Sequence, residues 1–286
     1  MENLVRFDWA IKRLLRNKAD YCVVEGLLSS VLERPIKIKN ILESEGNKET
    51  ADDKFNRVDL LAEDESGELM LFEIQNNREL DYFHRMAYGT SKVIAEYLKE
   101  GQPYEEIRKV YSINIVYFSL GQGDDYAYHG KTEFVSMHDT NDVLVLSEAQ
   151  REAFKCKTPS DIFPEYYLLR VDKFDAVAKT PLDEWISFLH SGEIPVTATA
   201  PGLQEARERL RVSQLSEDEL KEYHRIMENV RYQRSVIATG RAEGRAEGRA
   251  EERLAMAQKM KSLGLPFDQI SAITGLTVVE IESLSS

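Results

Sequence analysis

The stretch RVDLLAEDESGELMLFEIQNN, residues 57–77, carries the pattern that decides the fold. Two apolar runs flank a polar tip that contains Gly67, which is the usual pattern of a β-hairpin. Two acids, Asp59 and Glu73, interrupt these runs. Because an unpaired carboxylate is strongly disfavoured in a buried position, both acids need a partner. A cation is one such partner.

Side chains alternate between the two faces of a strand, so Glu73 and Gln75 share one face and Ile74 points to the other. If the hairpin turns at residues 66–67, Asp59 lies on the neighbouring strand near Glu73. Two carboxylates ~5 Å apart repel by ~3 kcal/mol at an effective dielectric near 20. A bound Mg²⁺ turns this repulsion into attraction, polarises a phosphodiester and activates water. The pattern therefore suggests a metal-dependent nuclease.

The same spacing also fits a solvated hairpin edge whose acids face water. Acidic residues are frequent in this chain, with 50 among its 286 residues, so an Asp followed by Glu-x-Gln arises by chance. The net charge of −13 argues against a sequence-independent coat on nucleic acid, which relies on many cationic phosphate contacts. It leaves room for an acidic site that recruits a divalent metal.

Composition places the chain among cytoplasmic proteins. Its 42% of hydrophobic residues suffice for one large domain with appendages, but no run of eighteen apolar residues occurs and the N-terminus is charged and amphipathic. We therefore expect no membrane partner. Two cysteines are too few for a disulfide framework, and no histidine stands at zinc-ligand spacing with a cysteine.

Periodicity predicts a compact α/β domain in the first part of the chain. The expected order is two opening helices ending before Pro35, an edge strand, the hairpin, a long helix and further strands. The predicted strands and the long helix lie at residues 35–42, 79–99, 110–120, 132–139 and 165–174.

After about residue 180 the chain becomes helical. Thr180 and Pro181 form a helix start, and residues 195–202 have the composition of a linker. A capping box, Ser216 to Glu219, opens the next helix. We predict a nuclease domain at 1–195, a helical segment at 196–240, a charged repeat at 241–261 and a small helix-turn-helix-like module at 262–286.

The repeat GRAEGRAEGRAE, residues 240–251, predicts a marginal helix or a spacer. Gly244 and Gly248 each cost a helix about 1 kcal/mol relative to Ala, and like charges recur four residues apart.

The terminal module is predicted as two short helices, with Gly275 ending the first and a capping box, Thr277 to Glu280, opening the second. The second helix has no Lys or Arg, so it is a poor DNA reader. Because so short a module buries apolar residues poorly by itself, we expect it to pack on another copy or on the core. We predict a homo-oligomer through these C-terminal helices.

Several segments, in order from about residue 6 to the C-terminus, together resemble one family. They are FDWAIKRLL, LLSSVLERPIKIKNIL, DKFNRVDLLAEDESGELMLFEIQNN, HRMAYGTSKVIAEYLKEGQPYEEIRKVYSINIVYF and the tail from the repeat onward. The chain resembles the Rpn-type recombination-promoting nucleases and transposases of the PD-(D/E)XK superfamily. The resemblance implies a restriction-endonuclease-like αβββαβ core, with a mixed sheet flanked by helices and a helical C-terminal tail. It also implies DNA cleavage with Mg²⁺ or Mn²⁺.

Carried over by position, Asp59 matches the motif's aspartate and Glu73 its second acid. The Ile74 carbonyl completes the metal site, and Gln75 takes the usual lysine position. Glutamine keeps a hydrogen-bond donor but lacks the charge, and loss of a comparable donor typically lowers a rate by ~10²–10³. The resemblance therefore implies an active but slow site.

Three cations are candidate contacts to DNA phosphates. Lys54 and Arg57 precede the hairpin, where they equally fit solvated loop cations. Arg85 falls within one helical turn of His84 and Tyr88, a grouping that equally fits an ordinary amphipathic helix. The expected function is a Mg²⁺-dependent endodeoxyribonuclease. The alternative is a catalytically inactive nuclease fold that serves as a binding or scaffold protein, which the Lys-to-Gln change and the acidic composition favour.

Overall fold

A computed structural model describes residues 21–42, 60–98, 100–175, 177–211 and 215–284. The chain divides into two compact units, Met1–Leu215 and Ser216–Ser286. The helix predicted near the N-terminus lies outside the described residues. No helix in the described ranges is both long and apolar enough to cross a membrane.

One mixed sheet organises the first unit, with strand order β1-β2-β3-β4-β6-β5. Strands β1, β2 and β3 pair antiparallel, β3, β4 and β6 pair parallel, and β5 closes the far edge antiparallel to β6. The strands are β1 (Ile38–Leu42), β2 (Leu60–Asp64), β3 (Leu69–Gln75), β4 (Val110–Val116), β5 (Ala127–Gly130) and β6 (Glu165–Arg170).

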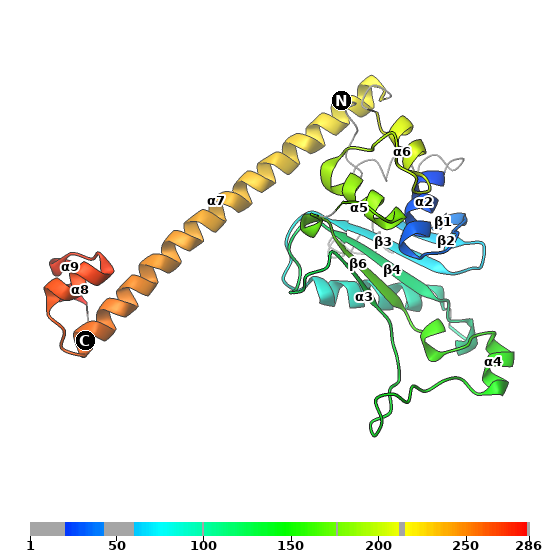
Figure 1. The fold of residues 1–286 in the computed structure, drawn as a ribbon, viewed down its shortest axis with the longest axis horizontal. Coiled ribbons are helices and arrows are strands. Elements are labelled where there is room, and N and C mark those ends of the chain that lie inside the picture. Colours follow the sequence, from blue (N-terminus) through cyan, green and yellow to red (C-terminus); the bar gives the residue numbers. More distant parts are fainter. Residues whose placement is uncertain (1–20, 43–59, 99, 176, 212–214, 285–286) are drawn as a thin grey trace. The chain divides into compact units, whose positions relative to one another are not determined.

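Helices cover both faces of this sheet. Figure 1 shows α3 on one face and α2 and α5 on the other. The order α2-β1-β2-β3-α3-β4 confirms the predicted αβββαβ core. The helices of this unit are α2 (Cys22–Val31), α3 (Tyr82–Tyr97), α4 (Glu148–Phe154), α5 (Pro181–Ser191) and α6 (Leu203–Arg209), with short 3₁₀ turns η2 (Tyr104–Glu106), η3 (Pro159–Asp161) and η4 (Val171–Lys173).

The hairpin of β2 and β3 forms as predicted, with Leu60 opposite Phe72 and Glu63 opposite Leu69. Asp64 stabilises its tip, because its buried carboxylate accepts hydrogen bonds from the backbone N–H groups of Ser66 and Glu68, each at 2.9 Å. Gly67 follows with φ +84°, a left-handed conformation that favours glycine. Local turn chemistry thus sets the register of the two strands.

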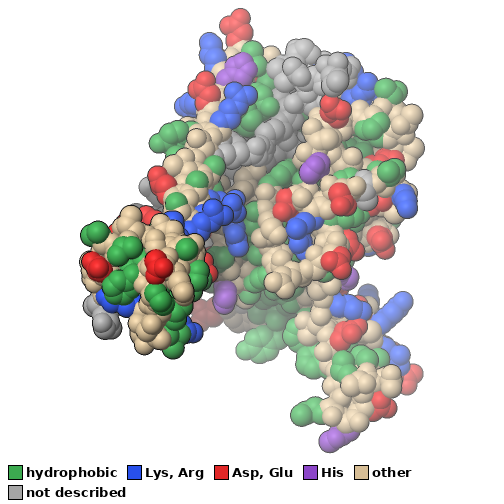
Figure 2. All heavy atoms as spheres, turned by 60° about the vertical axis from the view of Figure 1, so that its left-hand side comes forward, with side chains coloured by type: hydrophobic (Ala, Val, Ile, Leu, Met, Phe, Trp, Pro, Cys, Tyr) green, Lys and Arg blue, Asp and Glu red, His purple; other side chains and the backbone are tan. Residues whose placement is uncertain are grey.

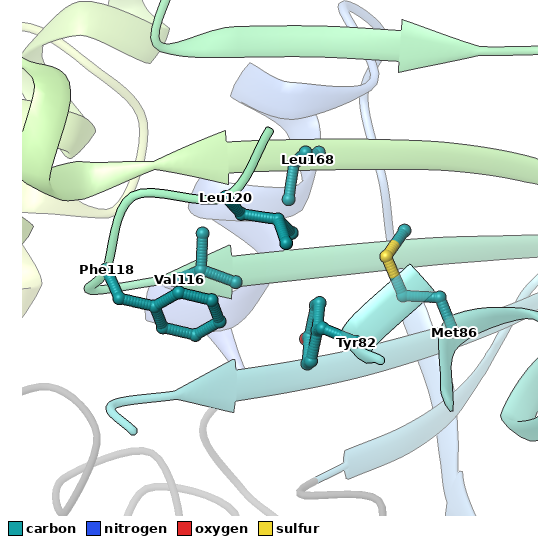
Figure 3. Packing of buried hydrophobic residues seen from close by; sticks show 6 residues of the cluster. All are labelled: Tyr82, Met86, Val116, Phe118, Leu120 and Leu168. Carbon is teal, nitrogen blue, oxygen red and sulfur yellow. The ribbon is translucent and has the colours of Figure 1, made fainter. Parts of the chain in front are cut away.

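Helix α3 is fixed to the sheet along its length. Near its C-terminal end Val93 packs on Leu69 and Leu71, which point from β3 toward the helix. At its start Tyr82 is fully buried and meets Phe118 edge to face, with ring centroids 5.9 Å apart. Figure 3 shows this second cluster, Tyr82, Met86, Val116, Phe118, Leu120 and Leu168. Anchoring at both ends holds the first turn of α3 beside the end of β3.

One strand prediction near the far edge of the sheet turns out differently. Residues 132–139, predicted as a strand, form only an isolated bridge between Val135 and Val143. Their apolar side chains are largely exposed, Met137 by 98%, so little burial of apolar surface stabilises a regular strand there. The edge strand is instead β5, four residues that the sequence did not mark as a strand. The prediction at 165–174 is confirmed by β6.

Residues 195–202 are held on α5 by a few specific contacts and do not form the predicted linker. Ala198 and Ala200 are buried, and the Glu184 carboxylate accepts hydrogen bonds from the N–H groups of Thr199 (2.7 Å) and Ala200 (2.6 Å). Trp185 Nε1 donates to the Pro201 carbonyl at 3.2 Å. The small residues that suggested flexibility therefore serve close packing against α5.

The second unit consists of α7 (Glu217–Ser262), α8 (Phe267–Thr274) and α9 (Val278–Ser283). Both predicted capping boxes are present, at Ser216 and at Thr277, and Gly275 ends α8 with φ +71°. Helix α7 spans 46 residues and runs through the repeat without a break. The repeat is therefore helical, as the first of the two predicted alternatives had it.

The terminal pair packs on the end of α7. Ala257, Ile270 and Ile281 are fully buried together. Lys261 Nζ donates to the carbonyls of Ile281 (3.1 Å) and Leu284 (2.7 Å) and so caps the last helix. Helix α7 itself thus supplies the face that buries Ile270 and Ile281, while Ile273 stays 57% exposed, and the predicted homo-oligomer stays a prediction.

Candidate active site

The candidate site lies where the carboxyl end of β3 meets the first turn of α3. Glu73 is 8% exposed and lies beside Asn114 in the parallel ladder with β4. Asn114 accepts a hydrogen bond from the Tyr82 hydroxyl at 3.3 Å, so both residues belong to the face that α3 covers. Gln75, two residues on, shares that face.

Arg85 joins two carboxylates in this site. Its Nε and one Nη lie 2.8 and 2.6 Å from Glu73 Oε1. Its other Nη donates to both oxygens of Glu79, at 3.1 and 3.2 Å. The guanidinium therefore lies between the strand that carries Glu73 and the loop that carries Glu79.

Arg85 keeps its positive charge in this site. Burial alone lowers the pKa of a guanidinium, but the carboxylates of Glu73 and Glu79 outweigh burial and raise the pKa of Arg85 above its usual value. Arg85 is therefore protonated throughout the physiological range. It supplies a permanent counter-charge to both acids.

Glu79 is a site residue that sequence reasoning missed. Besides pairing with Arg85, it accepts a hydrogen bond from the Gln75 side-chain Nε2. A carboxylate only accepts hydrogen bonds, so this contact fixes which end of the Gln75 amide faces Glu79. The one sequence signal was an acid four residues after Gln75, too common a spacing in this chain to stand out.

The structure brings together only some of the predicted residues. Glu73, Ile74 and Gln75 end β3, and Arg85 reaches them from α3. Asp59, Lys54 and Arg57 lie outside the described residues, so their predicted roles stay predictions. His84 and Tyr88, grouped with Arg85 in the sequence, are exposed on α3. A phosphate contact by Arg85 also stays a prediction, since its described contacts are with protein carboxylates.

Comparison with known proteins decides the family. Residues 5–240 match the family described as PD-(D/E)XK nuclease family transposase, which is more than half of the chain. The chain belongs to this family. No curated protein and no solved structure matches it significantly.

Membership in the PD-(D/E)XK transposase family indicates a nuclease or transposase type of function, that is, a hydrolase acting on nucleic acid. Nucleases of this superfamily generally use divalent metals. The match includes the whole sheet and the first half of α7, and it ends at residue 240, where the charged repeat begins. The repeat and the terminal helix pair are thus additions to the matched region.

The chemistry of the described donors fits a hard divalent cation. The carboxylate of Glu73, the carbonyl of Ile74 and the amide oxygen of Gln75 are oxygen donors, the kind that Mg²⁺ and Mn²⁺ prefer. Within the described ranges, no cluster of three His, Cys, Asp or Glu residues is arranged to hold a metal. A complete site therefore needs at least one further acid.

The charges at the surface are mixed. On the face drawn in Figure 2, Lys and Arg side chains lie among Asp and Glu side chains. Within the described residues visible there, they form no continuous basic surface.

Proposed function

We propose that this member of the PD-(D/E)XK transposase family is a Mg²⁺- or Mn²⁺-dependent DNA endonuclease of the recombination-promoting, mobile-element type, acting in the cytoplasm. The observation that carries the proposal is the place of Glu73. It is a nearly buried acid at the carboxyl end of β3, an inner strand of the sheet, with Gln75 two residues further on and the cation Arg85 in contact with it.

Asp59 is proposed as the second acid. The described ladder between β2 and β3 runs through Leu60 opposite Phe72. If this register continued by one residue, position 59 would stand opposite position 73, on the same face of the hairpin. Asp59, Glu73 and the Ile74 carbonyl would then hold the metal.

When bound, the metal would polarise the scissile phosphate and activate the attacking water. The chain's own residues prepare the site for this. Glu79 holds Gln75, so the amide is fixed before substrate arrives and no rotamer has to be ordered later. Arg85 neutralises the acids while no metal is bound, and it is the nearest described cation to any phosphate placed at Glu73.

An inactive scaffold is the competing function, and one observation favours it. Arg85 already compensates the charge of Glu73, and at the lysine position Gln75 is engaged with Glu79. Such a network is stable without any metal. The two functions differ in whether divalent metal binds at Glu73 and DNA is cut.

A plasmid-nicking assay separates them. Purified full-length protein should convert supercoiled plasmid to open circles with Mg²⁺ or Mn²⁺, and EDTA should stop the reaction. Glu73→Ala should abolish nicking. Glu152→Ala, an exposed acid on α4, is the matched control and should leave nicking unchanged. Absence of nicking together with absence of Mg²⁺ binding in calorimetry would establish the scaffold.

A further inference from the structure

The charged repeat on α7 carries an interaction surface. We propose that residues 240–251 pair in parallel with the same residues of a second copy of this chain, arginines of one helix facing glutamates of the other. This inference is independent of the catalytic proposal, because the repeat lies beyond the region that matches the nuclease family.

The repeat places opposite charges on opposite sides of one helix. Arginines recur every four residues, and glutamates recur every four residues two positions later. At ~100° per residue, each kind forms a row that drifts by ~40° per repeat, and the two rows stand ~200° apart. The rows are Arg241, Arg245 and Arg249 on one side and Glu243, Glu247 and Glu251 on the other.

In a single helix these rows are unfavourable. Neighbours at i and i+4 carry like charges, which lose a few tenths of a kcal/mol per pair. In the described part of the chain none of these six side chains forms an ion pair, whereas Lys221 and Asp218 near the start of α7 do, at 3.6 Å. All residues from 235 to 249 are exposed. The repeat is thus helical without internal charge compensation.

The glycines of the repeat lower the stability of the isolated helix further. Gly240, Gly244 and Gly248 each disfavour the helix by about 1 kcal/mol relative to Ala. A Cβ placed at any of the three would have no other atom within 4 Å, so no contact inside the protein requires glycine there. Glycine at these positions is instead useful to a helix that another backbone approaches closely.

A second copy in parallel orientation resolves both problems. Each helix has one row of charges on either side of the helix–helix contact. In a parallel pair with two-fold symmetry, the left-hand row of one helix meets the right-hand row of the other. If Gly240, Gly244 and Gly248 form the row at which the two helices touch, arginines of one helix face glutamates of the other on both sides of that row. An antiparallel pair would set arginines against arginines and glutamates against glutamates. The charge pattern therefore selects the parallel arrangement.

The same pattern argues against DNA as the occupant. Residues 240–251 contain three arginines and three glutamates and have no net charge. A phosphate backbone needs a cationic excess, and glutamates flank the glycine row here. A second copy of the chain offers opposite charges to the arginine row and to the glutamate row at the same time.

Sedimentation of the full-length protein tests the pairing. The wild type should be dimeric at low salt and dissociate more readily at high salt, since exposed ion pairs are screened. One variant carries Arg241→Glu, Arg245→Glu and Arg249→Glu, and its counterpart carries Glu243→Arg, Glu247→Arg and Glu251→Arg. Each alone should be monomeric, and an equimolar mixture should form dimers.

A monomeric wild type, a mixture that stays monomeric, or reversed variants that both remain dimeric would overturn the proposal. Circular dichroism should show that both variants keep their helix. Orientation is tested with Gly240→Cys and Gly248→Cys in a background with Cys22→Ser and Cys156→Ser. In a parallel pair, two copies of the same cysteine variant form a disulfide with each other under oxidising conditions, without the other variant. Cross-linking only when the two variants are mixed would mean an antiparallel pair and contradict the proposal.

Discussion

Arg85 contacts Glu73 through two of its nitrogen atoms, at 2.8 and 2.6 Å, and through its third it reaches Glu79. The proposed metal ligand therefore has a protein cation in the place where a divalent ion would also compensate its charge. A metal bound at Glu73 would therefore compete with this ion pair for the same carboxylate.

The competition predicts the behaviour of Arg85→Met. Mn²⁺ should bind this variant more tightly than the wild type, because the acids lose their built-in counter-charge. Without metal, the variant should unfold more easily by about 2 kcal/mol, since the largely buried carboxylate of Glu73 loses its ion pair with Arg85. Calorimetry with Mn²⁺ and thermal unfolding with EDTA measure the two effects. Weaker Mn²⁺ binding in the variant would mean that Arg85 orients Glu73 for the metal.

Gln75 is expected to be a working part of the site. Gln75→Ala should lose about one to three orders of magnitude in nicking rate, roughly what one positioned hydrogen-bond donor contributes. Gln75→Lys should fold and keep or raise the rate, because a lysine there also meets the Glu79 carboxylate. Equal rates for Gln75→Ala and wild type would remove Gln75 from the site.

A second buried ion pair makes stability depend on pH. Lys109 Nζ lies 2.7 Å from Glu165 Oε1 and also donates to the Ser160 and Phe163 carbonyls. Burial acts to raise the pKa of Glu165, but its bonds to Lys109 and His129 outweigh burial and hold that pKa below its usual value. The pair therefore stabilises the fold above the usual glutamate pKa of about 4.3 and loses this effect as pH falls through the lowered value.

Glu165→Gln should accordingly destabilise the protein by about 3 kcal/mol at pH 7, as expected when a buried pair loses one partner. The difference from wild type should shrink as pH falls below about 4. Urea unfolding at several pH values measures it. Glu152→Gln, at an exposed position, serves as control and should show no such trend. A difference that stays constant down to pH 3 would contradict the account.

Truncation after Thr239 removes the charged repeat and the terminal helices and should leave the nuclease activity of the first unit. The nuclease core, with Glu73 and Gln75, lies wholly in the first unit, so basal nicking should persist. The number of chains per particle should fall, because the repeat and the terminal helices are the predicted contact between copies. Light scattering, nicking and a DNA-binding titration on both proteins measure these effects. An unchanged number of chains per particle combined with lost DNA affinity would show that the tail reads DNA.

The sequence correctly predicted the turn of the hairpin and the starts of three helices. The hairpin at Gly67, the capping boxes at Ser216 and Thr277 and the start of α5 at Thr180 and Pro181 are all confirmed, since each depends on residues a few positions apart.

Tertiary contacts explain the differences. Residues 195–202 look like a linker but pack on Glu184 and Trp185, and residues 132–139 have strand-like composition but no neighbouring strand to complete a sheet. Glu79 is identified as a site residue by its contacts with Arg85 and Gln75, and its position in the sequence does not predict these contacts. At the site, the family pattern located Glu73 and Gln75, and the structure added their network.

Metal-dependent cleavage that requires Glu73 is the central claim, and single-turnover nicking of supercoiled plasmid tests it most directly. The wild type and Glu152→Ala should both nick with Mg²⁺ or Mn²⁺ and stop with EDTA, while Glu73→Ala protein with an unchanged unfolding transition should not nick at all. Undiminished, EDTA-resistant nicking by Glu73→Ala would contradict the account.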